Sequence, residues 1–322
     1  MHHYTLGGLS RATLLRLQHL TYLSVCCLSI ENFLQLSSLT SLLVLHMEVA
    51  GDDTPAVGPN SVPGLVFPAS LKVLHVLSPV EAAILSLVPT ALQELQLDCD
   101  VDGSDAGPGL FLSCMARLQH LASFVMLPDG GAMSGGVDWP LPCPAYSALT
   151  ASSSLVRLQL HNPPGGIWQY VFPAARTLPH LTAFVFAPHC EEPVEQPYWS
   201  RTNVASLVSC CPSLCRIEGI WVQHGLHVSE LHKLTALTRL CVTYEDSELS
   251  LIDDSLRGLA ELTQLHFLRL EINTGDDLAP GVFLPLTSLT GLTALEYQAL
   301  ELEGVDTQEF QIVSKVRLTL QK

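Results

Sequence analysis

One stretch, residues 262–273, constrains the fold of this chain more than any other. It reads LTQLHFLRLEIN, in which regularly spaced leucines precede a closing asparagine: Leu262, Leu265, Leu268, Leu270 and Asn273. The Leu-x-Leu alternation places Leu268 and Leu270 on the same side of a short strand, and the earlier leucines turn into the same core. The side-chain amide of Asn273 can bond to the backbone of the next turn. Because one such unit cannot bury its apolar face alone, the stretch predicts neighbouring copies.

Less complete copies of this motif recur along nearly the whole chain. The clearest cover residues 39–47, 234–242 and 289–297. Between positions 23 and 316, the middle apolar residues of the predicted strands are separated by eleven spacings with a mean of about 27 residues. The aligned residues are Leu23, Leu45, Leu74, Leu95, Phe124, Leu158, Phe184, Ile217, Leu240, Leu268, Leu295 and Val316.

The motif and its period resemble those of the leucine-rich repeat proteins, whose repeats run to ~20–29 residues. The resemblance implies an α/β leucine-rich repeat solenoid, a curved horseshoe with a parallel sheet of about a dozen short strands on its concave face. Most copies lack the closing asparagine, since Asp100 takes its place in one unit and Asn162 falls one residue early in another. We therefore expect an irregular, intracellular type of repeat, in which other groups satisfy the turns.

The repeat predicts a single domain over residues 1–322, because a solenoid grows as one unit. Two segments, near 128–148 and 188–203, interrupt it. We interpret both as loops inserted at one edge; for the first, a linker between two solenoid halves is the alternative. Short helices are expected within 80–88 and 203–211, because Pro89 and Pro212 would end them.

The composition of the chain limits the kinds of partner and the cellular compartment that we expect. The chain has 31 acidic and 15 basic residues, a balance that disfavours a nucleic-acid partner because duplex binding needs clustered Lys and Arg. No stretch approaches ~18 uncharged apolar residues, so no membrane partner is expected. No Asn-x-Ser/Thr acceptor occurs, and several of the 10 cysteines fall in or beside predicted strands as small apolar residues. These observations favour a reducing, cytoplasmic location.

Two segments resemble metal sites only weakly. Residues 98–103, DCDVDG, are similar to the start of a calcium loop, but the twelfth position, which needs a bidentate Glu, is Gly109. The cysteines at 210, 211 and 215, with His189 and Cys190 upstream, lack the paired spacing of a zinc site. We therefore predict no metal and no cofactor.

The sequence favours recognition over catalysis. It contains no Gly-x-Ser-x-Gly elbow, phosphate-binding loop or His-Glu-x-x-His motif, so no catalytic residue is predicted and the chain is not expected to be an enzyme. An ordered repeat surface loses little entropy on docking, which favours a non-catalytic protein–protein interaction scaffold with its partner on the concave face. Two alternatives stay open: the substrate-recognition subunit of a ubiquitin ligase, with its adaptor-binding region missing from this chain, and an enzyme or small-molecule binder that uses the edge insertions.

Residues that flank the core leucines of each strand are predicted to face the partner. The earlier units place Tyr22, His46, His75 and Glu94 there. In the later units Arg and Glu dominate, and they either pair across the sheet or form a mildly basic strip for an acidic partner segment. The predicted partner-binding residues are Arg157, Gln159, His161, Arg216, Glu218, Arg239, Arg269, Glu271, Glu296 and Arg317.

Two further expectations concern the ends of the chain and its core. Neither end shows a recognisable cap, which predicts self-association or a partner that covers an end. The strand leucines should be buried, namely Leu45, Leu95, Leu158, Leu240, Leu268 and Leu295.

Overall fold

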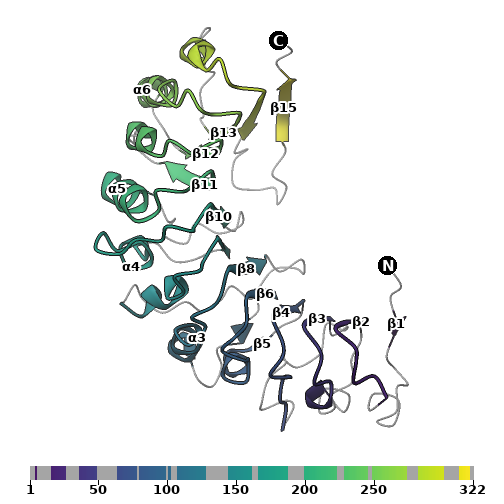
Figure 1. Ribbon diagram of the computed structural model, residues 1–322. Coiled ribbons are helices and arrows are strands. Elements are labelled where there is room, and N and C mark those ends of the chain that lie inside the picture. The colour runs from purple at the N-terminus through teal and green to yellow at the C-terminus, as the bar shows by residue number, and fades with distance from the viewer. Residues whose placement is uncertain are drawn as a thin grey trace, which may run out of the picture. The chain divides into compact units, whose positions relative to one another are not determined.

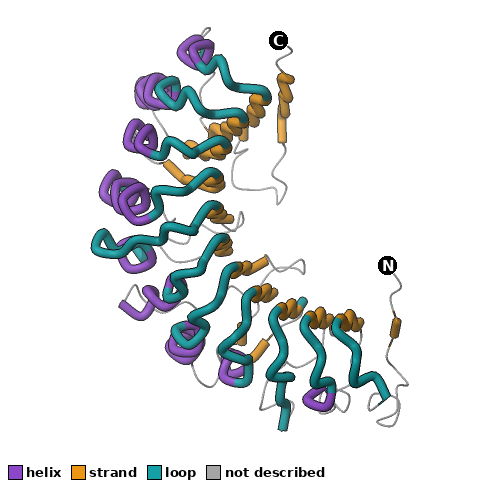
Figure 2. The backbone as a smooth tube through the Cα atoms, viewed as in Figure 1, coloured by secondary structure: helices purple, strands orange, loops and turns teal. Residues whose placement is uncertain are grey.

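The chain forms two compact units, Met1–Val171 and Phe172–Lys322. In each unit the strands of the main sheet lie on one side and the helical segments on the other (Figure 1, Figure 2). Whether both units act as the single domain expected over 1–322 stays a prediction. The computed structural model describes residues 4–5, 16–26, 36–48, 64–77, 80–98, 101–102, 107–127, 144–161, 166–187, 199–222, 228–245, 249–273, 282–300 and 312–319.

The first unit contains a parallel sheet and a separate two-stranded pair, β5 (Val80–Glu81) with β7 (Val101–Asp102). Its helical segments are η1 (Leu36–Ser38), η2 (Ala82–Ser86), α3 (Gly107–Met115), η3 (Pro144–Thr150) and α4 (Trp168–Val171). The strands of the parallel sheet, in spatial order, are β1 (Tyr4–Thr5), β2 (Tyr22–Cys26), β3 (Val44–Glu48), β4 (Val73–Val76), β6 (Glu94–Asp98), β8 (Ser123–Leu127) and β9 (Arg157–His161).

The second unit repeats this plan with longer strands. Its helical segments are α5 (Arg201–Cys210), η4 (Val228–Lys233), α6 (Leu249–Leu259) and η5 (Leu284–Ser288). Its strands, in spatial order, are β10 (Ala183–Ala187), β11 (Arg216–Val222), β12 (Arg239–Glu245), β13 (Phe267–Asn273), β14 (Ala294–Leu300) and β15 (Ile312–Thr319).

The Leu-x-x-Leu spacing forms tight turns that lead into the strands. The N–H of Leu262 donates to the carbonyl of Leu259 at 3.0 Å, and that of Leu265 donates to Leu262 at 2.9 Å. Bonds between residues three apart give a period of about three, so these leucines point to the same side. The same bonds join Leu36, Leu39 and Leu42 in the first unit, which shows that one local rule builds both units.

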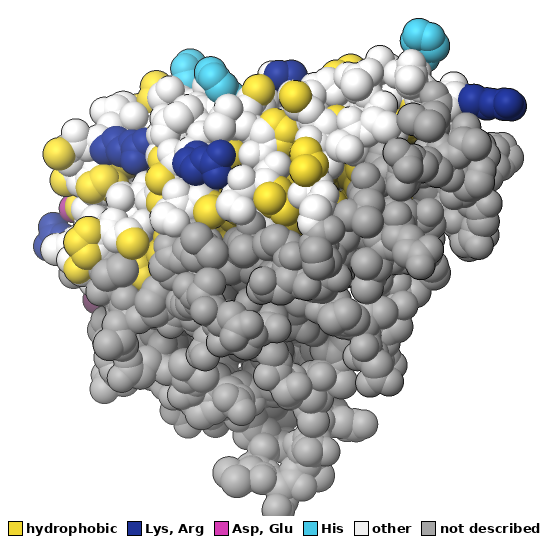
Figure 3. All heavy atoms as spheres, turned by 90° about the horizontal axis from the view of Figure 1, so that it is seen from below, with side chains coloured by type: hydrophobic (Ala, Val, Ile, Leu, Met, Phe, Trp, Pro, Cys, Tyr) yellow, Lys and Arg dark blue, Asp and Glu magenta, His cyan; other side chains and the backbone are white. Residues whose placement is uncertain are grey.

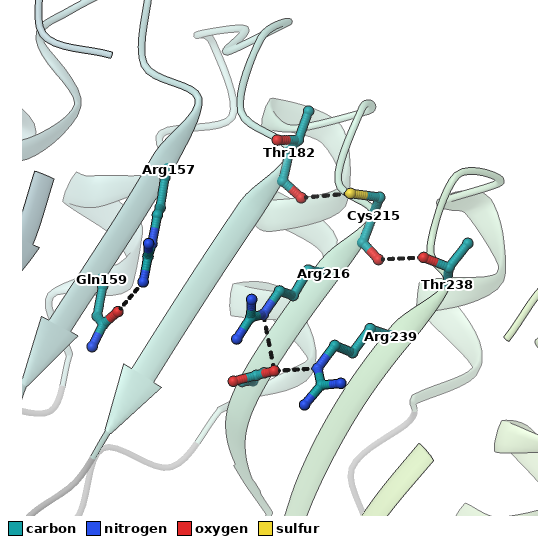
Figure 4. A network of polar contacts seen from close by, with 8 residues as sticks. Arg157, Gln159, Thr182, Cys215, Arg216, Thr238 and Arg239 are labelled. Carbon is teal, nitrogen blue, oxygen red and sulfur yellow. Dashed lines mark hydrogen bonds and ion pairs between the residues drawn. The ribbon is translucent and has the colours of Figure 1, made fainter. Parts of the chain in front are cut away.

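A backbone ladder replaces the missing asparagines. The carbonyl of the residue before a strand accepts two N–H groups from the next repeat; Thr238, for example, accepts from His266 at 2.9 Å and Phe267 at 3.0 Å. In the second unit, side chains add to the ladder. The thiol of Cys215 donates to the Thr182 carbonyl, and the hydroxyl of Thr238 donates to the Cys215 carbonyl, each at 3.2 Å (Figure 4). Ladders of this kind satisfy turn groups without a closing Asn.

The strand register follows the sequence alignment in both units. Leu23, Leu45, Leu74, Leu95, Phe124 and Leu158 stand in register in the first unit. In the second unit Phe184, Ile217, Leu240, Leu268 and Leu295 stand in register. The fold is therefore an α/β solenoid of leucine-rich-repeat type, as predicted.

Burial confirms five of the six core leucines. Leu45, Leu95, Leu158, Leu240 and Leu268 are 0% exposed. Leu295 is only partly buried, which corrects the prediction for this residue. It lies in β14, the last parallel strand among the described residues, so no further parallel repeat packs against it.

The prediction of a further parallel strand around Val316 is wrong, because this strand runs in the opposite direction. β15 pairs antiparallel to β14, with Val316 opposite Tyr297 and Leu318 opposite Leu295. Val316 therefore does not continue the parallel alignment. The hydrogen-bonding edge of β14 is covered by the chain itself, whereas the sequence suggested no cap at this end.

The two predicted helices are present in different forms. The helix expected over 203–211 is α5, which starts two residues earlier; the Ser200 hydroxyl accepts from the Asn203 N–H at 3.2 Å and caps it. The segment 80–88 holds the shorter η2, a 3₁₀ helix. The insertions near 128–148 and 188–203 fall mostly outside the described residues. Trp199 of the second is 2% exposed and packs against Phe172 and Phe184, so this residue belongs to the core.

Candidate interaction surface on the strands

Each strand presents one row of side chains away from the core, and these rows form what we call the strand face of a unit. In β12, Leu240 and Val242 are buried, whereas Arg239 and Cys241, which alternate with them, are partly exposed. The strand face of the second unit carries most of the predicted partner-binding residues: Arg216, Glu218, Arg239, Arg269, Glu271 and Glu296.

Three of these residues form one cluster, the Arg216–Glu218–Arg239 triad. The Nε of Arg216 donates to Oε1 of Glu218 at 2.9 Å, and the Nε of Arg239 donates to the same oxygen. Figure 4 shows the two guanidinium groups beside the shared carboxylate. The Arg216 and Arg239 side chains are 43% and 40% exposed, and that of Glu218 is 19% exposed. The triad thus holds two positive charges and one negative charge at the surface.

The shared carboxylate is ionised at neutral pH. Partial burial raises the pKa of Glu218, but hydrogen bonds from Arg216 and Arg239 and their charges outweigh this effect and leave the pKa below its ordinary value. The pairs between residues of adjacent strands agree with the prediction that Arg and Glu pair with each other on this face. The two arginines and one glutamate leave a surplus of one positive charge in the triad.

A β-bulge in β11 sets the position of Glu218. Ile217 pairs with Leu240 and Ile220 with Val242, so Glu218 and Gly219 together stand opposite the single residue Cys241. Gly219 has φ of +82°, and a Cβ at this position would lie 1.7 Å from the carbonyl oxygen of Phe186. Only glycine fits such a site. The sequence carried a signal that we missed, because the two isoleucines of RIEGIWV are three residues apart instead of two.

The next strand supports Arg239 from its other side. The guanidinium carbon of Arg239 lies 3.7 Å from the ring centroid of Phe267, its register partner in β13. A cation over an aromatic face at this distance is attracted to the ring and restricted in orientation. Phe267 was not among the predicted site residues, because its role depends on register.

Arg269 and Glu271 form a second pair on β13. Nη2 of Arg269 lies 2.6 Å from Oε1 of Glu271, and the Thr243 hydroxyl donates to Oε2 of Glu271 at 2.9 Å. Cys241 stands in register with Arg269, and burial together with the charge of Glu218 raises the pKa of its thiol to about 12. The thiol is therefore protonated at neutral pH and is a poor nucleophile.

The two last predicted residues lie at the edge of this unit. Glu296 of β14 is partly exposed and stands in register with Arg269 on one side and with Arg317 on the other. Only the backbone of Arg317, in β15, is described.

The remaining predicted residues belong to the first unit. Arg157 and Gln159 both lie on the strand face of β9, where Nη2 of Arg157 donates to Oε1 of Gln159 at 2.8 Å. His161 ends the same strand, and its side chain falls outside the described residues.

The strand face of the first unit carries an array of rings. Tyr22 contacts the ring of His46 edge-on at 5.3 Å, and His46 stacks on His75 at 4.2 Å. Nε2 of His75 lies 3.1 Å from Oε1 of Glu94. Burial lowers the pKa of His46 and the charge of His75 lowers it further, against an opposing effect of Glu94. When both histidines are uncharged, the three rings are neutral and Glu94 leaves the array with one negative charge.

Some large hydrophobic side chains are exposed to solvent. Figure 3 shows one face of the molecule, where hydrophobic side chains lie among Lys, Arg and His. Single exposed apolar residues are normal on folded proteins and indicate no site by themselves. Those of the first unit are Leu17, Tyr22, Leu43, Val66, Leu77 and Val156.

The weak metal candidates gain no support from the described residues. Cys210 and Cys211 are buried, and the hydrogen bond between the two thiols, together with burial, raises the pKa of Cys211. Cys190 and His189 lie outside the described residues, as do positions 99, 100 and 103 of the calcium-like segment. Within the described ranges, no three His, Cys, Asp or Glu residues gather as metal ligands would.

Comparison with known proteins adds a likeness to solved structures. No protein-family model and no curated protein matches the sequence. The chain is similar to a chain in the crystal structure of the mouse RP105/MD-1 complex, with 15% identity and a TM-score of 0.41 over 91% of this chain and 53% of that one. It thus spans about half the length of that chain. No helix in the described ranges has the length and apolar character needed to cross a membrane.

Proposed function

We propose that the chain is a non-catalytic protein–protein interaction scaffold that receives an acidic partner segment on the strand face of its second unit. The observation that carries the proposal is the row of three arginines on β11, β12 and β13, each held by a carboxylate on the same surface. Arginines fixed in this way can make forked bonds to a partner's carboxylates with little further loss of side-chain entropy.

The charge of the whole chain sharpens this proposal. Against a net charge of −16, the surplus positive charge of the Arg216–Glu218–Arg239 triad creates a local field that would draw an acidic segment to this part of the strand face. The ubiquitin-ligase and small-molecule alternatives stay predictions, because no contact among the described residues favours either.

We also propose a cytoplasmic location. The five cysteines whose side chains the structure describes, Cys114, Cys210, Cys211, Cys215 and Cys241, are all free thiols. Free buried thiols are compatible with a reducing compartment.

The experiment compares two triple variants in affinity capture from cell extract. The first replaces Arg216, Arg239 and Arg269 by Gln. The control replaces Arg117, Arg201 and Arg257 by Gln; it changes the net charge equally but lies on or beside the helical segments. The proposal expects the first variant to lose partners that the wild type and the control retain. Equal capture by all three proteins would contradict the proposal.

A further inference from the structure

The Arg216–Glu218–Arg239 triad has unused donors that point to a specific kind of ligand. Each arginine uses its Nε to bind Glu218, and the described residues offer no partner to the Nη groups of either one. Arg216 and Arg239 stand directly in register on adjacent parallel strands, about 4.8 Å apart along the hydrogen-bonding direction. Two planar groups therefore present their remaining N–H donors side by side.

No other carboxylate is in register with either arginine. The register partner of Arg216 in β10 is Ala183, and that of Arg239 in β13 is Phe267. Val185 stands in register with Glu218. The triad is thus bordered by small or apolar side chains, and its surplus positive charge is not neutralised by an adjacent strand.

Arg269 shows the opposite balance and serves as an internal comparison. It pairs with Glu271 and stands in register with Glu296, so one arginine meets two carboxylates. The local charge around Arg269 is thus less positive than at the triad, so an anion is attracted more strongly to the triad, although all three arginines lie on the same strand face.

We propose that the triad binds the phosphate of a phosphorylated side chain on a partner segment. A carboxylate has two oxygens and is satisfied by one guanidinium fork, whereas a phosphate offers three acceptor oxygens to two adjacent forks. Its charge of about −1.5 to −2 at pH 7 exceeds that of a carboxylate, so it is attracted more strongly to the two guanidinium groups. This inference rests on the proposed function and names the chemistry of its partner.

The test measures binding of a short peptide, acetyl-Gly-phosphoserine-Gly-amide, through the Arg Nε–H signals of the full chain in NMR. The same peptide with Glu or Ser in place of phosphoserine is the comparison. Saturable shifts at Arg216 and Arg239 are expected with phosphoserine, with affinity about tenfold above that of the Glu peptide. Affinity should fall between pH 7.5 and pH 5, because the phosphate takes up a proton near pH ~6 while Glu stays ionised.

Two pairs of substitutions distinguish the effect of guanidinium geometry on binding from the effect of charge. In these variants binding is followed by the backbone amide signals of β11 and β12, because glutamine and lysine lack the Nε–H group. Arg216→Gln with Arg239→Gln should abolish saturable binding, and Arg216→Lys with Arg239→Lys should weaken it, because lysine keeps the charge but loses the fork. Arg201→Gln on α5 should leave the affinity unchanged within about twofold, since it is outside the strand face. Equal affinity for the Glu and phosphoserine peptides, or equal loss in Arg201→Gln, would overturn the inference.

A last measurement keeps this inference distinct from the proposed function. Extract treated with phosphatase before capture should yield no partner that depends on Arg216 and Arg239. If the phosphopeptide does not bind but the Arg216, Arg239 and Arg269 variant still loses partners, the phosphate inference fails and the scaffold stands. If the phosphopeptide binds while that variant keeps every partner, the scaffold proposal fails at this surface. Partners that survive phosphatase yet require the triad would restrict the site to carboxylates and overturn the phosphate assignment.

Discussion

The strand faces of the two units differ in chemistry although the same turns and leucines build both. In the first unit, the face holds Tyr22, His46 and His75 as an array of contacting rings with one carboxylate at its end. In the second unit, the corresponding positions hold arginines and glutamates in ion pairs. The core positions are restricted by packing, whereas the alternating positions can vary without affecting the fold. The residues between the leucines therefore set the chemistry of each strand face.

The largest expected effect comes from the bulge, which only the second unit needs for its charged cluster. Gly219→Ala should cost more than about 3 kcal/mol of unfolding free energy, because it combines positive φ with a Cβ only 1.7 Å from a backbone oxygen. Gly291→Ala is the matched control, since its nearest backbone oxygens lie at 3.1 and 3.3 Å. Chemical denaturation of both variants checks the prediction, and equal losses would remove the special role of the bulge.

The second effect tests whether the two cores are equivalent. Leu74→Ala in the first unit and Leu240→Ala in the second should each cost about 2–5 kcal/mol, because both side chains are 0% exposed. Leu295→Ala should cost clearly less, because that side chain is partly exposed. Hydrogen exchange followed by mass spectrometry assigns each loss to its unit. Loss at Leu295 as large as at Leu240 would show that β15 completes the core.

A smaller effect concerns the charged cluster. Glu218→Gln should lower stability by about 1 kcal/mol at pH 7, since the pair is partly exposed and screened. Because the folded pKa of Glu218 lies below the unfolded one, its contribution is present above pH ~4.5 and is lost as pH falls through the folded pKa. Denaturation curves of wild type and variant should therefore converge in acid. A constant difference down to the lowest pH that preserves the fold would contradict this assignment.

The smallest effect belongs to the ring array of the first unit. His46 has a folded pKa below its ordinary value of 6.5, so the folded state binds its proton less readily than the unfolded state. Stability should be full above pH ~6.5 and decline as pH falls through the lowered pKa. His46→Phe keeps an aromatic ring and should remove this part of the decline, as measured by denaturation from pH 5 to 8. An unchanged slope in the variant would assign the decline to other groups.

Sequence reasoning was strongest for features that repeat. Leu-x-x-Leu-x-x-Leu-x-Leu predicted the strand register across both units, because a side-chain period of two allows only one face to be apolar. It also predicted the partly exposed positions of Arg216, Arg239 and Arg269. It failed at the last strand, since the same apolar pattern fits a parallel or an antiparallel neighbour and the direction depends on the path of the chain.

The sequence by itself thus determined the repeat, the core leucines and the rows of side chains on the strand faces. The tertiary structure decided which of those side chains act together. The bulge at Gly219 places Glu218 between two arginines of different strands, and register places Phe267 beneath one of them. The apolar positions that become buried repeat along the chain, so they can be identified from short stretches of sequence. The ion pair of Glu218 with Arg239 and the stacked rings of His46 and His75 join residues that are 21 and 29 positions apart, and these contacts exist only in the assembled sheet.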